Sequence, residues 1–209
     1  MKTTMTMAST VLAASASVAQ TVNFDKDPVG VPPADWTCGV TGRGGARWTV
    51  EPDPGAPSPP NVLMQSGSGD FPWCVRTGTA ILDGFVEVKF KPIRGREDQA
   101  GGVVWRWKDG KNYYVARANA LENNVSLYYT EGGMRKTLKY VDSPVPSNAW
   151  HVLRVEFKGT HIHVLLNGKA AIEFADTHIS GAGAVGVWTK ADSVTAFDDF
   201  SFGMSTKPR

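Results

Sequence analysis

Hydrophobic and polar residues alternate with a period of two along most of the chain, and no long segment shows the 3.6-residue period of an amphipathic helix. Between residues 149 and 176 this alternation predicts a three-strand meander with a break at Gly159. Asn167-Gly168 predicts a two-residue type I′ hairpin inside the meander, because Asn and Gly tolerate the positive φ angles of that turn. Short runs of Gly, Asn, Asp and Pro separate the other alternating segments.

The same pattern predicts ten or more short strands in the whole chain. Many short strands with regularly spaced turns are typical of an all-β fold, and we expect a two-sheet antiparallel jelly-roll β-sandwich. The last strand is expected to pair near the first, because sandwiches often bring their termini together. The proline-rich run at residues 51–60 is interpreted as a rigid surface loop, so residues 20–209 are expected to form a single domain.

The N-terminus, residues 1–19, resembles a secretory signal peptide. Lys2 supplies a basic start, small and apolar residues follow, and Ser17-Val18-Ala19 fits a small-x-small cleavage site. The mature chain is therefore expected to begin at Gln20 and to be secreted or periplasmic, with a disordered N-terminal tail as the alternative. No other apolar run approaches the ~20 residues that a membrane-spanning helix needs.

Charge narrows the classes of partner. The formal net charge is +2, and the basic residues are scattered through the sequence. Nucleic-acid-binding proteins instead gather basic residues in a patch or stripe. We therefore expect no nucleic-acid partner, and we expect the chain to act as a monomer.

The chain has two cysteines, Cys38 and Cys74, each close to a tryptophan. In an oxidising compartment an isolated pair is most simply a disulfide, which would contribute about 3 to 4 kcal/mol for a loop of this size. A zinc site needs about four ligands, and no cluster of Cys and His supplies them. Two buried free thiols remain the alternative.

Alternation also assigns side chains to the two faces of each predicted strand. In "GGVVWRW", Trp105 and Trp107 share the face with the better core residues, so Arg106 should project outward. In "NYYVARANA", Arg117 would be costly to bury without a partner. Arg117 and Asn119 are therefore placed on the open face, with the alanines inside.

If these strands are neighbours, one concave surface gathers a mixed set of polar and aromatic side chains. Such a mixture suits a saccharide, because a ring stacks on the apolar face of a sugar while Arg, Asn and carboxylates bind its hydroxyls. The structural alternative is that Arg106 pairs with Glu97 or Asp98 and that Trp188 only covers the sheet. The candidate ligand-binding residues are Arg106, Arg117, Asn119, Trp188, Lys190 and Gln99.

The blocks "AWHVLRVEFKGTHIHVLLNGKAAIEF" and "GAVGVWTKADSVTAFDDFSF" resemble the C-terminal half of concanavalin A-like lectin/glucanase domains. Within that superfamily, "GGVVWRWKDGKNYYVARANA" is similar to the central strands of laminin-G-like modules and of bacterial 3-keto-disaccharide hydrolase-type domains. The resemblance covers residues 84–202. It implies a curved two-sheet jelly roll whose concave face often receives glycans, but one fold hosts lectins, hydrolases and structural modules.

The sequence departs from the hydrolases of this fold in its acidic residues. Laminarinase-type enzymes carry a Glu-x-Asp-x-x-Glu pattern, which places two carboxylates on one sheet face, and that pattern is absent here. Catalytic residues are therefore unknown. Glu97, Asp98 and His151 are the candidate bases for a single-base reaction on a 3-keto sugar, whose α-proton is acidified.

Sandwich modules of this type often bind calcium near their termini, and Asp25 and Asp199 are the candidate ligands for Ca²⁺. Calcium needs six to eight oxygens, so capping of a turn is the alternative role, and no cofactor is expected to be required.

Three functions remain open. The favoured hypothesis is a secreted or periplasmic carbohydrate-binding protein that uses the concave-face site. The alternatives are a saccharide-acting enzyme, either a 3-keto-glycoside hydrolase or a lyase, and a laminin-G-like structural or protein-interaction module.

Overall fold

The structure is a computed structural model that describes residues 19–204. The predicted signal peptide falls almost entirely outside the described residues and stays a prediction. The described part of the chain contains fifteen β-strands and no helix, and hence no helix that would cross a membrane. The strands are β1 (Gln20–Val22), β2 (Trp36–Gly45), β3 (Trp48–Pro52), β4 (Asn61–Gln65), β5 (Ser68–Arg76), β6 (Gly84–Arg94), β7 (Ala100–Asp109), β8 (Asn112–Asn119), β9 (Asn124–Glu131), β10 (Met134–Asp142), β11 (His151–Lys158), β12 (His161–Leu166), β13 (Lys169–Ala175), β14 (Ala184–Trp188) and β15 (Val194–Met204).

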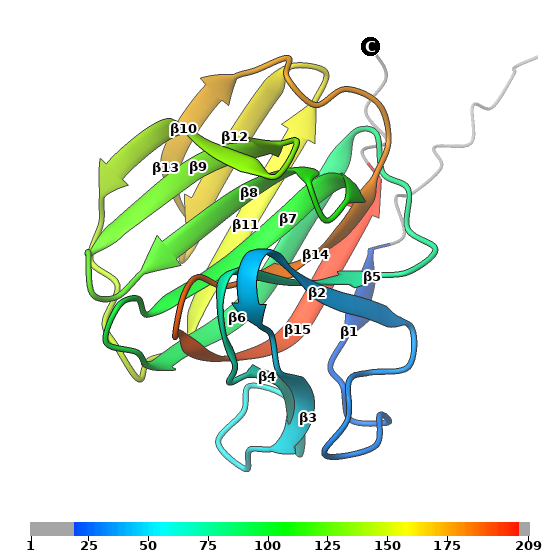
Figure 1. Ribbon diagram of the computed structural model, residues 1–209, viewed down its shortest axis with the longest axis vertical. Helices are drawn as coiled ribbons and strands as arrows, with labels where there is room; N and C mark the ends of the chain where they lie inside the picture. The colour runs from blue at the N-terminus through cyan, green and yellow to red at the C-terminus, as the bar shows by residue number, and fades with distance from the viewer. Residues whose placement is uncertain (1–18, 205–209) are drawn as a thin grey trace, which may run out of the picture.

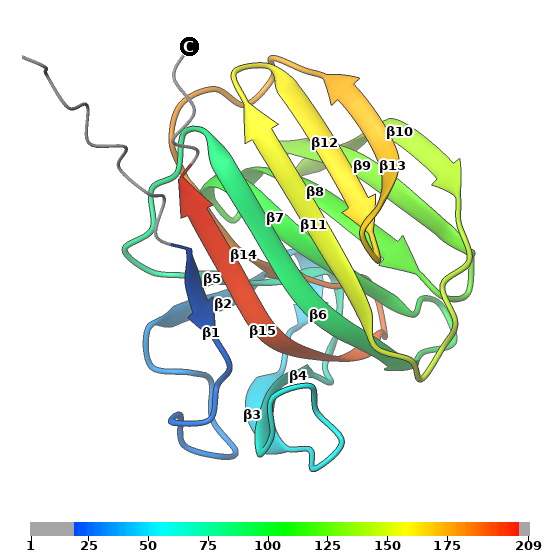
Figure 2. The same ribbon diagram turned by 180° about the vertical axis from the view of Figure 1, so that it is seen from behind.

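The strands form two antiparallel sheets that lie face to face (Figure 1). Sheet A has the order β13-β12-β11-β6-β15-β4-β3, with β1 paired to β15, and its strands lie nearer the viewer in Figure 2. Sheet B has the order β10-β9-β8-β7-β14-β5-β2. The predicted all-β jelly-roll sandwich is confirmed, and the first and last strands pair as expected.

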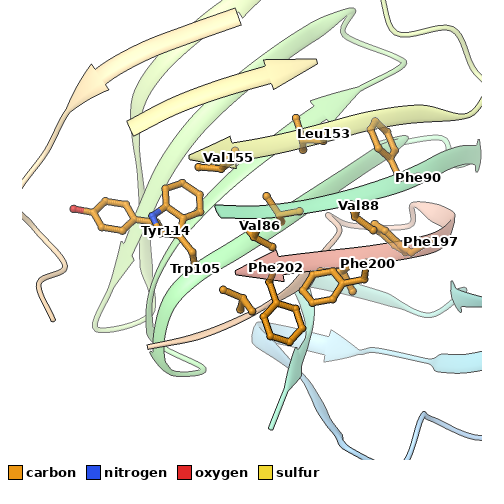
Figure 3. Close-up of a cluster of buried hydrophobic side chains, with 14 of the residues drawn as sticks. Val86, Val88, Phe90, Trp105, Tyr114, Leu153, Val155, Phe197, Phe200 and Phe202 are labelled. Atoms are coloured by element: carbon orange, nitrogen blue, oxygen red, sulfur yellow. The ribbon is translucent and has the colours of Figure 1, made fainter. Parts of the chain in front are cut away.

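The main hydrophobic core fills the space between the sheets (Figure 3). Trp105 of sheet B stacks on Tyr114 at 5.3 Å between ring centroids and on Phe157 of sheet A at 6.0 Å. Phe90 and Phe197 are fully buried at the other end of the same layer. Burying a large apolar side chain contributes about 1.5–3 kcal/mol, so this layer is the main source of stability.

The predicted meander and hairpin are confirmed. Strands β11, β12 and β13 pair consecutively in sheet A. Asn167 and Gly168 have φ angles of 51° and 76°, and they join β12 to β13 with Leu166 opposite Lys169. Both positive φ angles are those of a type I′ turn.

Cys38 and Cys74 form the predicted disulfide. The two residues lie directly opposite each other on β2 and β5, with their Cα atoms 3.9 Å apart. The bond therefore fastens the edge strand β2 to the rest of sheet B.

The predicted orientation of Arg106 and Trp107 is wrong. Arg106 has a φ angle of 46°, and the register of β7 against β8 shifts at this point. Such a bulge interrupts the alternation of a strand, so the residues after it change faces. Trp105 lies in the core as expected, but Trp107 packs with Val104 on the outer face of sheet B.

Candidate functional site

Sheet B curls around its outer face. The Arg135 guanidinium on edge strand β10 lies 4.5 Å from the ring of Phe71 on β5. These strands are five places apart in the sheet, which corresponds to about 24 Å in a flat sheet. The contact is possible only because the sheet is strongly coiled, so its outer face is concave, as the sequence predicted.

The tip of the β7–β8 hairpin closes one end of this concave face. Thr41 on edge strand β2 hydrogen-bonds the Tyr113 hydroxyl at 2.8 Å and donates to the Gly110 carbonyl at 2.5 Å. On the other side of the tip, the Gly133 amide donates to the Lys111 carbonyl at 2.9 Å. The hairpin therefore bridges β2 and the β9–β10 turn, which come from opposite edges of the sheet.

A second hydrophobic cluster fills the concave face. Trp188 was predicted to be exposed there; it lies on the expected face but is fully buried. Its ring stacks on Phe71 at 5.9 Å between centroids, and the half-buried Phe71 covers it. The buried members of this cluster are Trp73, Val75, Val104, Tyr113, Val115, Tyr128 and Trp188.

Arg135 lies at the mouth of this cluster, with its guanidinium against three aromatic rings. The guanidinium carbon is 4.2 Å from the ring of Tyr128, 4.5 Å from Phe71 and 5.7 Å from Trp188. Its Nη1 atom is buried and has no hydrogen-bond partner. Burial lowers the pKa of Arg135, because removal from water disfavours the charged form. We call Arg135, Phe71, Tyr128 and Trp188 the arginine–aromatic cluster.

Arg117 and Asn119 lie on the concave face as predicted, but they are buried rather than open. The Asp98 carboxylate is fully buried between them: it accepts a hydrogen bond from Arg117 Nη1 at 2.8 Å and one from Asn119 Nδ2. Lys190 pairs with the second oxygen of Asp98. Burial of Arg117 is tolerated because this carboxylate neutralises it, which corrects the assumption that Arg117 had no partner.

Glu122 supplies a second carboxylate to Arg117, at 2.5 Å from its Nη2 atom. Burial acts to raise the pKa of Glu122, but the hydrogen bond from Asn124 and the charge of Arg117 lower it below the usual value. Arg117 is thus held between two carboxylates, and Asp98 between two cations. The polar end of the concave face is an internally balanced network.

A cavity of about 540 Å³ opens beside the arginine–aromatic cluster. Phe71 belongs to both the cluster and the cavity wall. The cavity is lined by Arg43, Gly44, Ser68, Gly69, Asp70, Phe71, Glu97, Lys190 and Ala191. It offers one aromatic ring, two cations and two carboxylates to a ligand, and Lys190 is the only predicted ligand-binding residue among them.

Arg106 lies away from this site. Its guanidinium donates to the carbonyls of Ile179 at 3.1 Å, Leu82 at 3.2 Å and Gly159 at 2.7 Å. It also stands 5.9 Å from the ring of Phe157, in sheet A. The bulge turns Arg106 toward the end of the sandwich, where it ties loops together instead of joining the concave face.

Gln99 and His151 have their polar atoms engaged elsewhere. The Gln99 side chain donates to the Gly95 carbonyl and accepts from Ser147. His151 lies on β11 of sheet A, where Nε2 bonds the Pro146 carbonyl at 2.8 Å and the ring packs on Phe90. Of the three candidate bases, only Glu97 lines the cavity.

The calcium candidates have protein partners. Asp199 pairs with Lys89 at 2.7 Å, and the Asp25 carboxylate accepts a hydrogen bond from the Asn61 amide at 3.2 Å. No group of three or more His, Cys, Asp or Glu residues within residues 19–204 is arranged to hold a metal ion. These residues give the calcium prediction no support.

Sequence reasoning missed Arg135 and Phe71. Residues 130–136, "TEGGMRK", were interpreted only as a turn. The turn could have been used to predict the position of Arg135. Gly132-Gly133 places Arg135 opposite Thr130, and Thr130 lies on the same face of β9 as Tyr128, two residues away. Counting alternate residues outward from this hairpin would have placed Arg135 with the aromatic residues.

Neither a known family model nor a curated protein matches the chain. Solved structures are similar to it. The carbohydrate-binding module CBM66 from Bacillus subtilis is 18% identical with a TM-score of 0.63, over 83% of this chain and 97% of the module. A β-glucanase from Bacillus licheniformis is 12% identical with a TM-score of 0.60, over 92% and 100%.

The exoplasmic/lumenal domain of VIP36, in a form bound to Ca²⁺ and Man3GlcNAc, is 9% identical with a TM-score of 0.56, over 84% of this chain and 85% of that domain. These likenesses confirm the concanavalin A-like lectin/glucanase fold that the sequence predicted. At such low identity they establish the fold and leave the function to the site.

Proposed function

We propose that this protein is an exported saccharide-binding protein and that the saccharide occupies the cavity beside Phe71 on the concave face of sheet B. The main observation behind this proposal is that the half-buried ring of Phe71 lies in the cavity wall together with Arg43, Lys190 and Glu97. An aromatic ring and a few convergent charged groups are the composition of a sugar site. The structural neighbours that bind or act on carbohydrates by their titles support this proposal.

The geometry favours binding over catalysis. Asp98 is enclosed by Arg117, Asn119 and Lys190, and His151 belongs to the other sheet. Two carboxylates, Asp70 and Glu97, line the cavity, and the Asp70 carboxylate accepts a hydrogen bond from the Arg43 amide at 2.7 Å. Glu97 is the only one of the three candidate bases in the cavity wall. The single-base enzyme hypothesis therefore depends on Glu97 alone.

The test is titration of the protein with an oligosaccharide panel, followed by the variants Phe71→Ala and Glu97→Gln. Phe85→Ala is the matched control, because Phe85 is also half-buried and also carries an arginine on its ring, but lies on the outer face of sheet A. We expect Phe71→Ala to weaken binding by about tenfold, the value of one sugar-stacking ring, and Phe85→Ala to leave it unchanged.

Melting temperatures of the variants check that each is folded. Equal loss of affinity in Phe71→Ala and Phe85→Ala would refute the location of the site. Absence of binding to every saccharide in the panel would refute the function and favour a protein-interaction module.

A further inference from the structure

Arg135 carries a charge that nothing within the described chain neutralises. No Asp or Glu oxygen in residues 19–204 lies within 4.0 Å of its guanidinium nitrogens. Three rings surround the guanidinium, and Nη1 is sealed from solvent without a partner. Buried polar groups in folded proteins are normally hydrogen-bonded. The Nε atoms of Arg106 and Arg117 are also sealed without a partner, but those two guanidiniums make other hydrogen bonds, whereas Arg135 makes none with the described residues.

The nearby carboxylates are already committed. Asp98 binds Arg117 and Lys190, and Glu122 binds Arg117. Arg117 in turn lowers the pKa of Arg135 by its like charge, while Asp98 acts in the opposite direction. Burial and the charge of Arg117 thus leave Arg135 an incompletely compensated cation against Phe71, which lines the cavity.

We propose that Arg135 binds the anionic group of an acidic saccharide, either the carboxylate of a uronic acid or a sulfate ester. This inference deepens the proposed function and rests on it. A guanidinium presents a planar fork of donors that matches two oxygens of a carboxylate or sulfate, and the rings hold this fork in place before the ligand arrives. Of the three guanidinium nitrogens only Nη1 is sealed, so stacking on the rings leaves the edge formed by Nε and Nη2 for the ligand.

The charges of the cavity define where the anionic group sits. Glu97 and Asp70 line the cavity and repel an anion, although Asp70 already accepts a hydrogen bond from the Arg43 amide, whereas Phe71 is shared with Arg135. The anionic substituent is therefore expected on the Phe71 side, and the neutral hydroxyls of the same sugar near Glu97 and Lys190.

The experiment compares three ligands by titration calorimetry of the full chain. They are a galacturonate oligosaccharide, the same oligosaccharide with its carboxyl groups reduced to alcohols, and a sulfated form of the reduced one. The variants are Arg135→Gln and Arg135→Lys. Arg154→Gln is the matched control, because Arg154 also stacks on a phenylalanine, Phe85, at 4.0 Å but is paired with Glu87 and Glu156.

We expect an acidic ligand to bind at least tenfold more tightly than the neutral one, and Arg135→Gln to remove that preference. Arg135→Lys should recover only part of it, because an ammonium cannot form the paired hydrogen bonds. Arg154→Gln should behave as the parent. Preference for the uronate or for the sulfate identifies the source of the anion.

Equal affinity for all three ligands, or a preference that survives Arg135→Gln, would overturn the inference while the proposed function stands. Absence of binding to all three would overturn both. Retention of the acid preference in Arg135→Lys at full strength would show that charge alone, without the fork geometry, recognises the ligand, and would refute the bidentate arrangement.

Discussion

The outer face of each sheet carries an arginine stacked on a phenylalanine, but only the arginine on sheet A is paired with carboxylates. On sheet A, Arg154 stacks on Phe85 at 4.0 Å and reaches Glu87 at 3.3 Å and Glu156 at 2.9 Å. On sheet B, Arg135 stacks on Phe71 at 4.5 Å and has no carboxylate within reach in the described residues. An arginine on a phenylalanine is therefore not by itself a site; the missing anion distinguishes the two faces.

Curvature explains why the faces differ. Along β6 and β11 of sheet A, most outer residues are charged and all are at least partly exposed, which is the ordinary solvated side of a sandwich. Sheet B coils until side chains from distant strands touch, so its outer face excludes water and becomes a second small core. Charges that are inexpensive on sheet A become costly on sheet B and must be paired, or reserved for a ligand.

The largest expected effect comes from the network of buried charges on sheet B. Asp98→Asn leaves Arg117 and Lys190 without the carboxylate they share, so we expect the free energy of unfolding to fall by about 3–5 kcal/mol. Glu87→Gln, which removes a partner of Arg154 on sheet A, should cost at most about 1 kcal/mol. Urea unfolding of both variants measures the contrast, and equal losses would show that the two faces do not differ in this way.

The sequence was sufficient for the features that follow from local alternation. It placed Ala116 and Ala118 in the core and Arg117 on the opposite face, and the structure agrees. It failed at Arg106, because one residue with a positive φ angle reverses the parity of a strand and leaves no mark in a hydrophobic pattern.

The candidate site was harder to predict for a different reason. Whether Trp188 is exposed depends on how far sheet B coils, and coiling is a property of seven paired strands rather than of any one segment. The partner of Arg117 was likewise hidden, because Asp98 reaches it from the segment before β7. The face on which a side chain lies can be predicted from its own strand. Its burial and its charge partners on a coiled sheet depend on strands that are distant in the sequence.

A buried aspartate on sheet A gives the next prediction, of intermediate size. Asp198 on β15 accepts hydrogen bonds from the Ser58 and Asp199 amides, each at 2.7 Å, but has no cation partner among the described side chains. Burial raises its pKa to about 6. The folded protein therefore holds this proton more tightly than the unfolded chain, so the contribution of Asp198 to stability falls as pH rises from about 4 to 6.

Asp198→Asn isolates this contribution, because the variant cannot titrate at this position. The stability of the parent minus that of the variant should decrease by on the order of 1–2 kcal/mol between pH 4 and pH 7. Denaturant unfolding at several pH values measures the difference. A difference that stays flat would mean that burial leaves the pKa of Asp198 unchanged, and one that rises with pH would mean that the fold stabilises Asp198 as an anion.

The smallest expected effect on stability tests the central contrast most directly. Arg135→Met replaces a partly desolvated cation by an apolar side chain of similar length that fits against Phe71, Tyr128 and Trp188. We expect the free energy of unfolding to stay the same or rise by up to about 1 kcal/mol, because the lost cation–π attraction is offset by the removal of an unpartnered buried donor. Arg154→Met on sheet A should lower the free energy of unfolding slightly, because Glu87 and Glu156 lose the arginine with which they pair. Thermal and urea unfolding measure both variants. A group that is retained for ligand binding is expected to contribute little to the stability of the fold. A clear loss of stability in Arg135→Met would therefore mean that Arg135 stabilises the concave face instead of serving as an anion-binding residue.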